Sequence, residues 1–180
     1  MRGIAYFIYK NIKILFLTLF IFIISYSCRE KNYSAKKYIN YIGYLDPNTT
    51  ISSTSFALCG TGKIEGTHHG LPKLAYKPNK GIFDKTIRSK YQNNEYTDSG
   101  YLNFRFVINC KGEIGRVEII QMNIDLEETE LNSEMIDQLY QLTSESENWN
   151  GYTTKDQKPI DYYMYVSYKI IDGEITEILP

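Results

Sequence analysis

The spacing of apolar and polar residues predicts regular elements in the second half of the chain. Apolar residues recur at helical intervals in two segments, which predicts two amphipathic helices. Other segments are rich in β-branched and aromatic residues, and the longest of them alternate as half-buried strands do. The predicted elements are a helix, two strands, a helix and two strands, at residues 81–91, 101–109, 115–122, 130–146, 161–171 and 174–179.

Short turns connect the predicted strands in pairs. Gly112 permits the positive φ that a tight turn between the first two strands requires, and Asp172-Gly173 forms a two-residue turn before the last strand. Two hairpins and two helices in this order predict an α+β domain over residues 81–180. In this domain an antiparallel sheet carries both helices on one face.

The first half of the chain lacks this regularity. Residues 49–80 are rich in Ser, Thr, Gly and Pro and show little periodicity, so mostly loop is expected, with a short strand at residues 55–59. We therefore expect residues 28–80 to form a tether and an irregular segment that precedes the domain.

Residues 1–27 have the pattern of a secretory signal. Basic residues precede the apolar run at residues 14–24, and small residues lead from it to Cys28. The uncharged stretch at residues 14–28 is shorter than the roughly 20 apolar residues that span a bilayer as a helix. A cleaved signal is therefore predicted, and it places the rest of the chain outside the cytoplasm.

The end of this leader resembles a bacterial lipoprotein signal with a relaxed cleavage motif, Ser25-Tyr26-Ser27-Cys28. The resemblance implies cleavage before Cys28 and lipidation of its thiol, which would anchor the protein to a membrane of the cell envelope. The mature protein would then be periplasmic or surface-facing. The alternative is an uncleaved signal anchor that begins nearer Ile4.

Charge and composition favour a protein partner over a nucleic-acid partner. The formal net charge is −1, and three of the 20 basic residues lie in the leader, which leaves 17 against 21 acidic residues after it. Such a chain has no broad basic field for nucleic acid. The 17 tyrosines suit β-sheets and contact surfaces, so a protein partner is the more natural expectation.

Two cysteines remain after the leader. Cys59 and Cys110 could form a disulfide in an oxidising compartment, which would stabilise the fold by about 4 kcal/mol in the chain-entropy model. Two unpaired thiols are the equal alternative, because spacing along the chain does not give the Cα separation that a bridge requires.

The residues that most invite a catalytic interpretation are His68 and His69, with Cys59 nearby in the sequence. One hypothesis is that they form a thiol–imidazole pair in an envelope hydrolase, and another is that they form a metal site. Adjacent histidines on an extended segment point to opposite sides, and the flanking glycines suggest a flexible loop. We therefore expect solvated histidines, with no catalytic residues, no metal and no cofactor.

A Gly-led alternating strand with a turn and second strand at residues 100–117 is followed by a helix, Trp149 and the Lys-Pro-Ile sequence at residues 158–160. In this pattern, residues 81–180 resemble the C-terminal domain family of TonB, the energy-transducing periplasmic protein. The resemblance implies the same α+β fold and a partner bound at a sheet edge as an extended peptide. The long Pro-rich spacer of such transducers is not visible, so the resemblance does not itself imply energy transduction.

We therefore expect a lipid-anchored envelope protein that is not an enzyme and binds a partner protein or peptide by sheet-edge contact. Strand 161–171 is the candidate edge, with Tyr163, Tyr165 and Lys169 as candidate contacts, although strand 174–179 can cover it. One alternative is that these tyrosines only fill the second face of the sheet. Another is an inner-membrane TonB-type energy transducer for outer-membrane transport.

Overall fold

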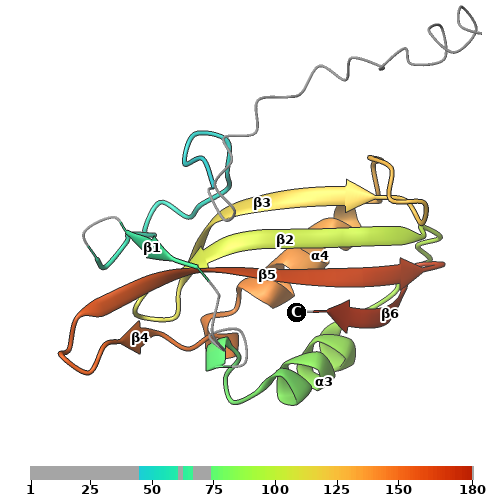
Figure 1. Cartoon of the computed structure of the whole chain (residues 1–180). Helices are drawn as coiled ribbons and strands as arrows, with labels where there is room; N and C mark the ends of the chain where they lie inside the picture. Colours follow the sequence, from blue (N-terminus) through green and yellow to red (C-terminus); the bar gives the residue numbers. More distant parts are fainter. Residues whose placement is uncertain (1–44, 61–62, 67–73, 180) are drawn as a thin grey trace, which may run out of the picture. The chain divides into compact units, whose positions relative to one another are not determined.

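The computed structural model describes residues 45–60, 63–66 and 74–179, all within a compact unit that spans Ile42–Pro180. The predicted α+β class is confirmed, because an open sheet and two helices make up this unit (Figure 1). Its elements are β1 (Ile64–Glu65), α3 (Lys80–Lys90), β2 (Gly100–Ile108), β3 (Ile114–Met122), α4 (Ser133–Ser144), a 3₁₀ turn (Ser146–Asn148), β4 (Tyr152–Thr153), β5 (Pro159–Ile171) and β6 (Glu174–Leu179).

Strand β5 lies at the centre of the sheet. Strand β2 pairs with it antiparallel along most of its length, and β3 pairs antiparallel with the far side of β2. On the opposite side, β5 pairs with β6 near one end and with β1 near the other. The β1 pairing is parallel, so the prediction of a purely antiparallel sheet is wrong at this strand, which lies in the segment without sequence periodicity.

Side-chain caps determine where the helices begin. The Asn79 side chain accepts a hydrogen bond from the Ile82 amide at 3.0 Å, and α3 starts directly after it. Asn132 caps α4 in the same way through the amides of Glu134 and Met135. The second helix therefore begins at Ser133, later than the apolar periodicity alone predicts.

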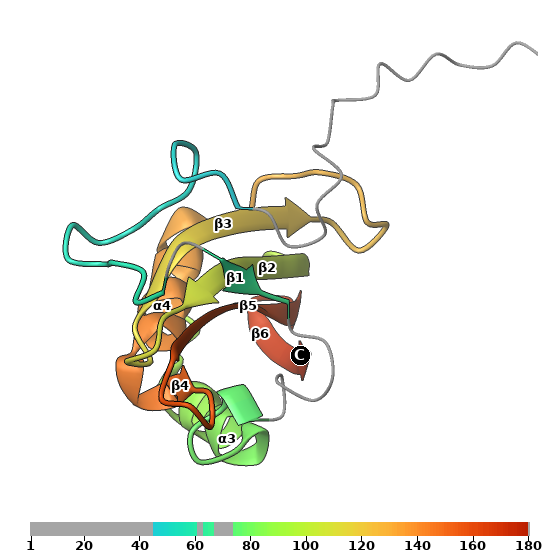
Figure 2. The same ribbon diagram turned by 60° about the vertical axis from the view of Figure 1, so that its left-hand side comes forward.

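One face of the sheet and both helices share a single core. Figure 2 shows how the two helices lie against the sheet. Alternate residues of β2 and β5 are fully or almost fully buried, and they pack with side chains of α3 and α4. Both helices therefore cover the same face, as the sequence pattern predicts. The strand residues are Leu102, Phe104, Phe106 and Ile108 on β2 and Tyr162, Met164, Val166, Tyr168 and Ile170 on β5.

The compact unit extends to the N-terminal side of the predicted 81–180 range. Ala75 and Tyr76 are buried in the main core, and Leu45 is also buried. Ile51 exchanges two backbone hydrogen bonds with Val117 of β3, each 2.8 Å long. The first half of the chain thus contributes core and sheet contacts that its composition does not reveal.

The turn between β5 and β6 has the predicted two-residue form. Asp172 and Gly173 both have positive φ, 50° and 75°, as a type I′ hairpin turn requires. A side chain at Gly173 would also place its Cβ 2.1 Å from the Tyr96 carbonyl oxygen. By contrast, the predicted strand at residues 55–59 is wrong, and the strand of this region is β1, at Ile64–Glu65.

Candidate protein-binding surface

The side of β5 that faces away from β2 is paired at both ends but not in the middle. The β1 register ends at Tyr162, and the β6 register starts at Ser167. Figure 1 shows these two short strands at opposite ends of β5. Among the described residues, no strand pairs with residues 164–166 on this side, and we call this stretch the β5 gap.

The hairpin geometry shows which backbone groups face the β5 gap. Ile171 and Glu174 flank the two-residue turn, and such a pair exchanges backbone hydrogen bonds. Backbone groups along a strand alternate in direction, so every second residue before Ile171 directs its N–H and C=O away from β2. Tyr165 is one of these residues. Among the described residues, none forms a hydrogen bond with its backbone N–H or C=O on this side.

The three candidate contact residues of β5 differ in their surroundings. Tyr165 has 45% of its surface exposed and lies in the β5 gap. Tyr163 is half-buried. Lys169 forms an ion pair with Glu177 of β6 at 2.9 Å, and this hydrogen bond and the carboxylate charge raise the Lys169 pKa above its ordinary value. Of the three, Tyr165 combines an exposed side chain with a backbone that pairs with no described strand on this side.

Strand β5 is not the free edge strand that the sequence interpretation takes it to be. It is the central strand, because β6 folds back against it through the hairpin turn and β1 pairs near its start. The appended β6 covers residues 167–171, as the sequence analysis considered. Among the described residues, the part of this side that no strand covers is therefore the β5 gap.

Strands β3 and β6 each pair with one strand only, and their other edges are partly blocked. On β3, Ile51 bonds the backbone of Val117, and the Thr129 amide donates to the Gln121 carbonyl. On β6, the Arg88 guanidinium donates to the carbonyl oxygens of Ile175 and Thr176. Capped edges of this kind oppose unspecific strand addition.

Cys59 and Cys110 form a disulfide, with their Cα atoms 5.9 Å apart. The bridge joins the irregular segment to the turn after β2. Beside it, the carboxylate of Asp161 accepts hydrogen bonds from the amides of Cys59 and Gly60 at 3.0 and 2.8 Å. Asp161 is buried, and sequence reasoning gave it no role, because an acidic residue at the start of a strand carries no signal of a partner so distant in the chain.

The structure describes one of the three residues of the catalytic alternative, Cys59. Cys59 is bridged, so it has no thiolate to act as a nucleophile. His68 and His69 lie outside the described residues. Within the described ranges, no three His, Cys, Asp or Glu side chains are grouped so that they could hold a metal ion.

No protein-family model, curated protein or solved structure matches this chain. The TonB-like resemblance and the functions that it implies therefore stay predictions. The leader and Cys28 lie outside the described residues. Within the part of the chain that the structure describes, no helix is long and apolar enough to cross a membrane.

Proposed function

We propose that this chain is a lipid-anchored protein of the cell envelope whose TonB-like domain binds an extended segment of a partner protein at the β5 gap. The observation that supports this most directly is Tyr165, whose side chain is exposed and whose backbone on this side pairs with no strand among the described residues. An extended segment can add to such a strand through backbone hydrogen bonds, while side-chain contacts provide selectivity.

The flanking strands limit what can bind. Because β1 and β6 occupy the ends of this side of β5, only a short segment pairs with the backbone between them. Few backbone hydrogen bonds are then available, each contributing about 1 kcal/mol. Contacts with the exposed Tyr165 ring must supply much of the remaining affinity, and aromatic side chains are suited to this role at interfaces.

A proline at position 165 tests the proposed binding mode. Tyr165 directs its N–H into the β5 gap, so Tyr165→Pro removes a donor for the partner but no hydrogen bond of the β2–β5 ladder. The ligand is a peptide selected from a displayed library on the full-length protein. We expect a folded variant whose dissociation constant for this peptide is at least about tenfold larger than that of the wild type. Isothermal titration calorimetry measures this constant, and circular dichroism verifies the fold.

Two controls separate the backbone from other contributions. Tyr165→Val removes the ring but keeps the N–H, so the additional loss in the proline variant reports the backbone bond. The His68→Ala/His69→Ala variant should bind the peptide as the wild type does. An unchanged dissociation constant for folded Tyr165→Pro, or lost binding in the double histidine variant, would place the site elsewhere.

The membrane anchor is tested by Cys28→Ser. Without the thiol the acyl chain cannot be attached there, so incorporation of a palmitate analogue should be lost, and the protein should leave the membrane fraction or be mislocalised within it. Ser27→Ala is the matched control, since it keeps a small residue before the cysteine. Normal incorporation of the palmitate analogue in Cys28→Ser would contradict lipidation at Cys28 and favour an uncleaved N-terminal anchor, as in an energy transducer of the inner membrane.

A further inference from the structure

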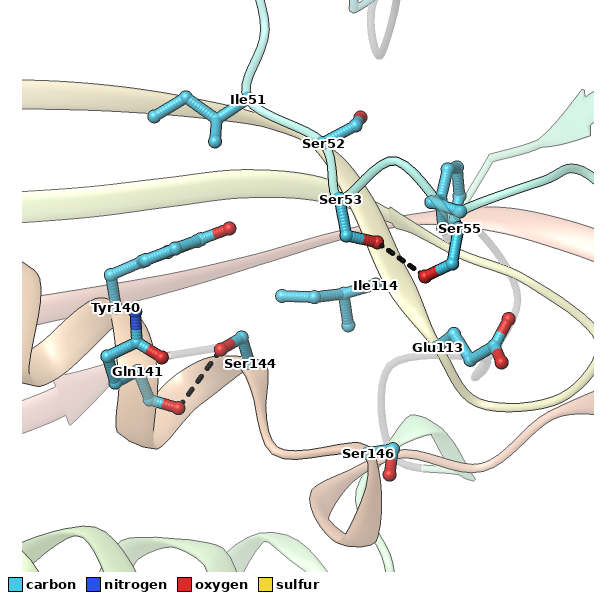
Figure 3. Close-up of a pocket in the computed structure, with 11 residues that line it drawn as sticks. Ile51, Ser52, Ser53, Ser55, Glu113, Ile114, Tyr140, Gln141, Ser144 and Ser146 are labelled. Carbon is cyan, nitrogen blue, oxygen red and sulfur yellow. Dashed lines mark hydrogen bonds between the residues drawn. The ribbon is translucent and has the colours of Figure 1, made fainter.

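A pocket of about 470 Å³ lies on the helix side of the sheet, away from the β5 gap. Its walls are the C-terminal half of α4, the start of β3 and the irregular stretch at residues 51–56 (Figure 3). The volume lies within the range of typical small-molecule sites.

Groups that can both donate and accept hydrogen bonds dominate the polar lining. The irregular stretch contributes the hydroxyls of Ser53 and Ser55, which bond each other at 3.2 Å. From the helix side come the Tyr140 hydroxyl, the Gln141 amide and the Ser146 hydroxyl. Figure 3 shows the Tyr140 hydroxyl directed into the space between α4 and the irregular stretch.

Charge is almost absent from the lining. Among the described lining residues there is no Lys or Arg, and the single carboxylate is that of Glu113. Glu113 is already bonded to the Asn109 side-chain amide at 2.7 Å. An anionic ligand would find no cation here and would meet this carboxylate, whereas a metal ion would find too few acidic ligands.

Apolar groups alternate with these polar ones. In Figure 3, Ile114 lies between α4 and the irregular stretch, and Ile51 lies on that stretch. The ring of Tyr140, which packs edge-on against Phe104, forms a further flat surface. A purely apolar ligand would leave the surrounding hydroxyl and amide groups unpaired, at a cost for each buried group.

We propose that this pocket binds a neutral carbohydrate. A sugar combines hydroxyl groups, which match donors that are also acceptors, with C–H faces, which match the Ile114 and Tyr140 surfaces. It carries no charge to conflict with Glu113. This site shares no residue with the β5 gap, so the sugar proposal can be tested independently of the proposed peptide binding.

The pocket wall is preorganised by contacts far apart in the chain. The Arg116 amide donates to the Ser52 hydroxyl at 2.6 Å, next to the paired backbones of Ile51 and Val117. The disulfide at Cys59 holds the end of the same segment. A fixed wall lowers the entropic cost of ordering the site around a ligand.

The test uses cellotetraose and N-acetylated chitotetraose with the full-length, oxidised protein. We expect at least one of them to give saturable ¹H–¹⁵N NMR shifts at α4 and at residues 51–56. The double variant Gln141→Ala/Ser146→Ala should raise the dissociation constant for the sugar about tenfold, because it removes two hydrogen-bonding groups from the pocket. The matched control Ser89→Ala/Gln92→Ala removes the same groups from the exposed end of α3 and its C-terminal flank, and should leave binding unchanged.

Four results would overturn the proposal. They are the absence of saturable shifts with both sugars, an unchanged dissociation constant in the Gln141→Ala/Ser146→Ala variant, an equal loss in the Ser89→Ala/Gln92→Ala control, and stronger binding of a sulfated tetrasaccharide than of the neutral ones. A peptide bound at the β5 gap should not displace the sugar, which distinguishes failure of this site from failure of the peptide site.

Discussion

Replacing Cys59 and Cys110 together by serine is expected to lower the free energy of unfolding by about 4 kcal/mol. The disulfide closes a loop with a sequence separation of 51 residues, and its loss returns conformational freedom to the unfolded chain. Urea unfolding followed by circular dichroism compares the double variant with the oxidised wild-type protein. Against a typical domain stability of roughly 5–15 kcal/mol, this change is large.

Two controls show whether the effect belongs to the bridge. Wild-type protein with a reductant should unfold as the Cys59→Ser/Cys110→Ser variant does, and Cys28→Ser should match the oxidised wild type. A loss below about 1 kcal/mol would contradict the expectation. It would mean that the Ile51–Val117 bonds and the Asp161 carboxylate hold the irregular segment without the disulfide.

Trp149→Ala is expected to reduce the free energy of unfolding by about 3–5 kcal/mol. The Trp149 side chain is 1% exposed and lies among three aromatic rings whose centroids are 5.1–5.3 Å away, those of Tyr76, Phe83 and Phe106. Its Nε1–H donates to the Thr143 carbonyl at 2.7 Å. Truncation leaves a cavity between α3 and the sheet and an unpaired carbonyl oxygen. Thermal and urea unfolding measure the loss.

Trp149→Phe keeps most of the ring volume and loses the indole donor, so its cost should be clearly smaller than that of Trp149→Ala. Ile82→Ala on the exposed side of α3 serves as the surface control, because 43% of the Ile82 surface is already accessible. Its cost should stay within about 0.5 kcal/mol. Equal stability losses for Trp149→Ala and Ile82→Ala would show that Trp149 is not central to the core.

Most of the helices and strands were predictable because their signals are local. The alternation in residues 101–109 and 161–171 follows from one face being buried, and it requires no knowledge of neighbouring strands. The Asp172-Gly173 turn was predictable for the same reason, since the positive φ of both residues is a property of that dipeptide. The late start of α4 was missed, because the Asn132 cap competes with an apolar pattern that begins earlier.

The candidate site was predictable only in part. Tyr165 was named because it lies on the polar side of an alternating strand, and the structure shows its side chain exposed. Which part of its strand pairs with no described strand depends on where the β1 register ends and the β6 register begins. These are pairings between segments distant in the chain. Lys169 was named on the same pattern, whereas its ion pair with Glu177 exists only once β6 folds back.

The sequence by itself determined the α+β class, the order of the two helices and four longer strands, and the buried face of the long strands, because side-chain periodicity indicates which positions face away from water. Only the tertiary structure decided that β5 is central, that Cys59 meets Cys110 and that Asp161 binds the amides beside that bridge. It also placed the residues 51–56 against α4 to form the pocket. The physical reason is that side-chain periodicity specifies which face of a helix or strand is buried. Which elements lie next to each other depends on contacts between distant segments of the chain. The entropic cost of closing the loops between those segments is offset only when the whole core assembles.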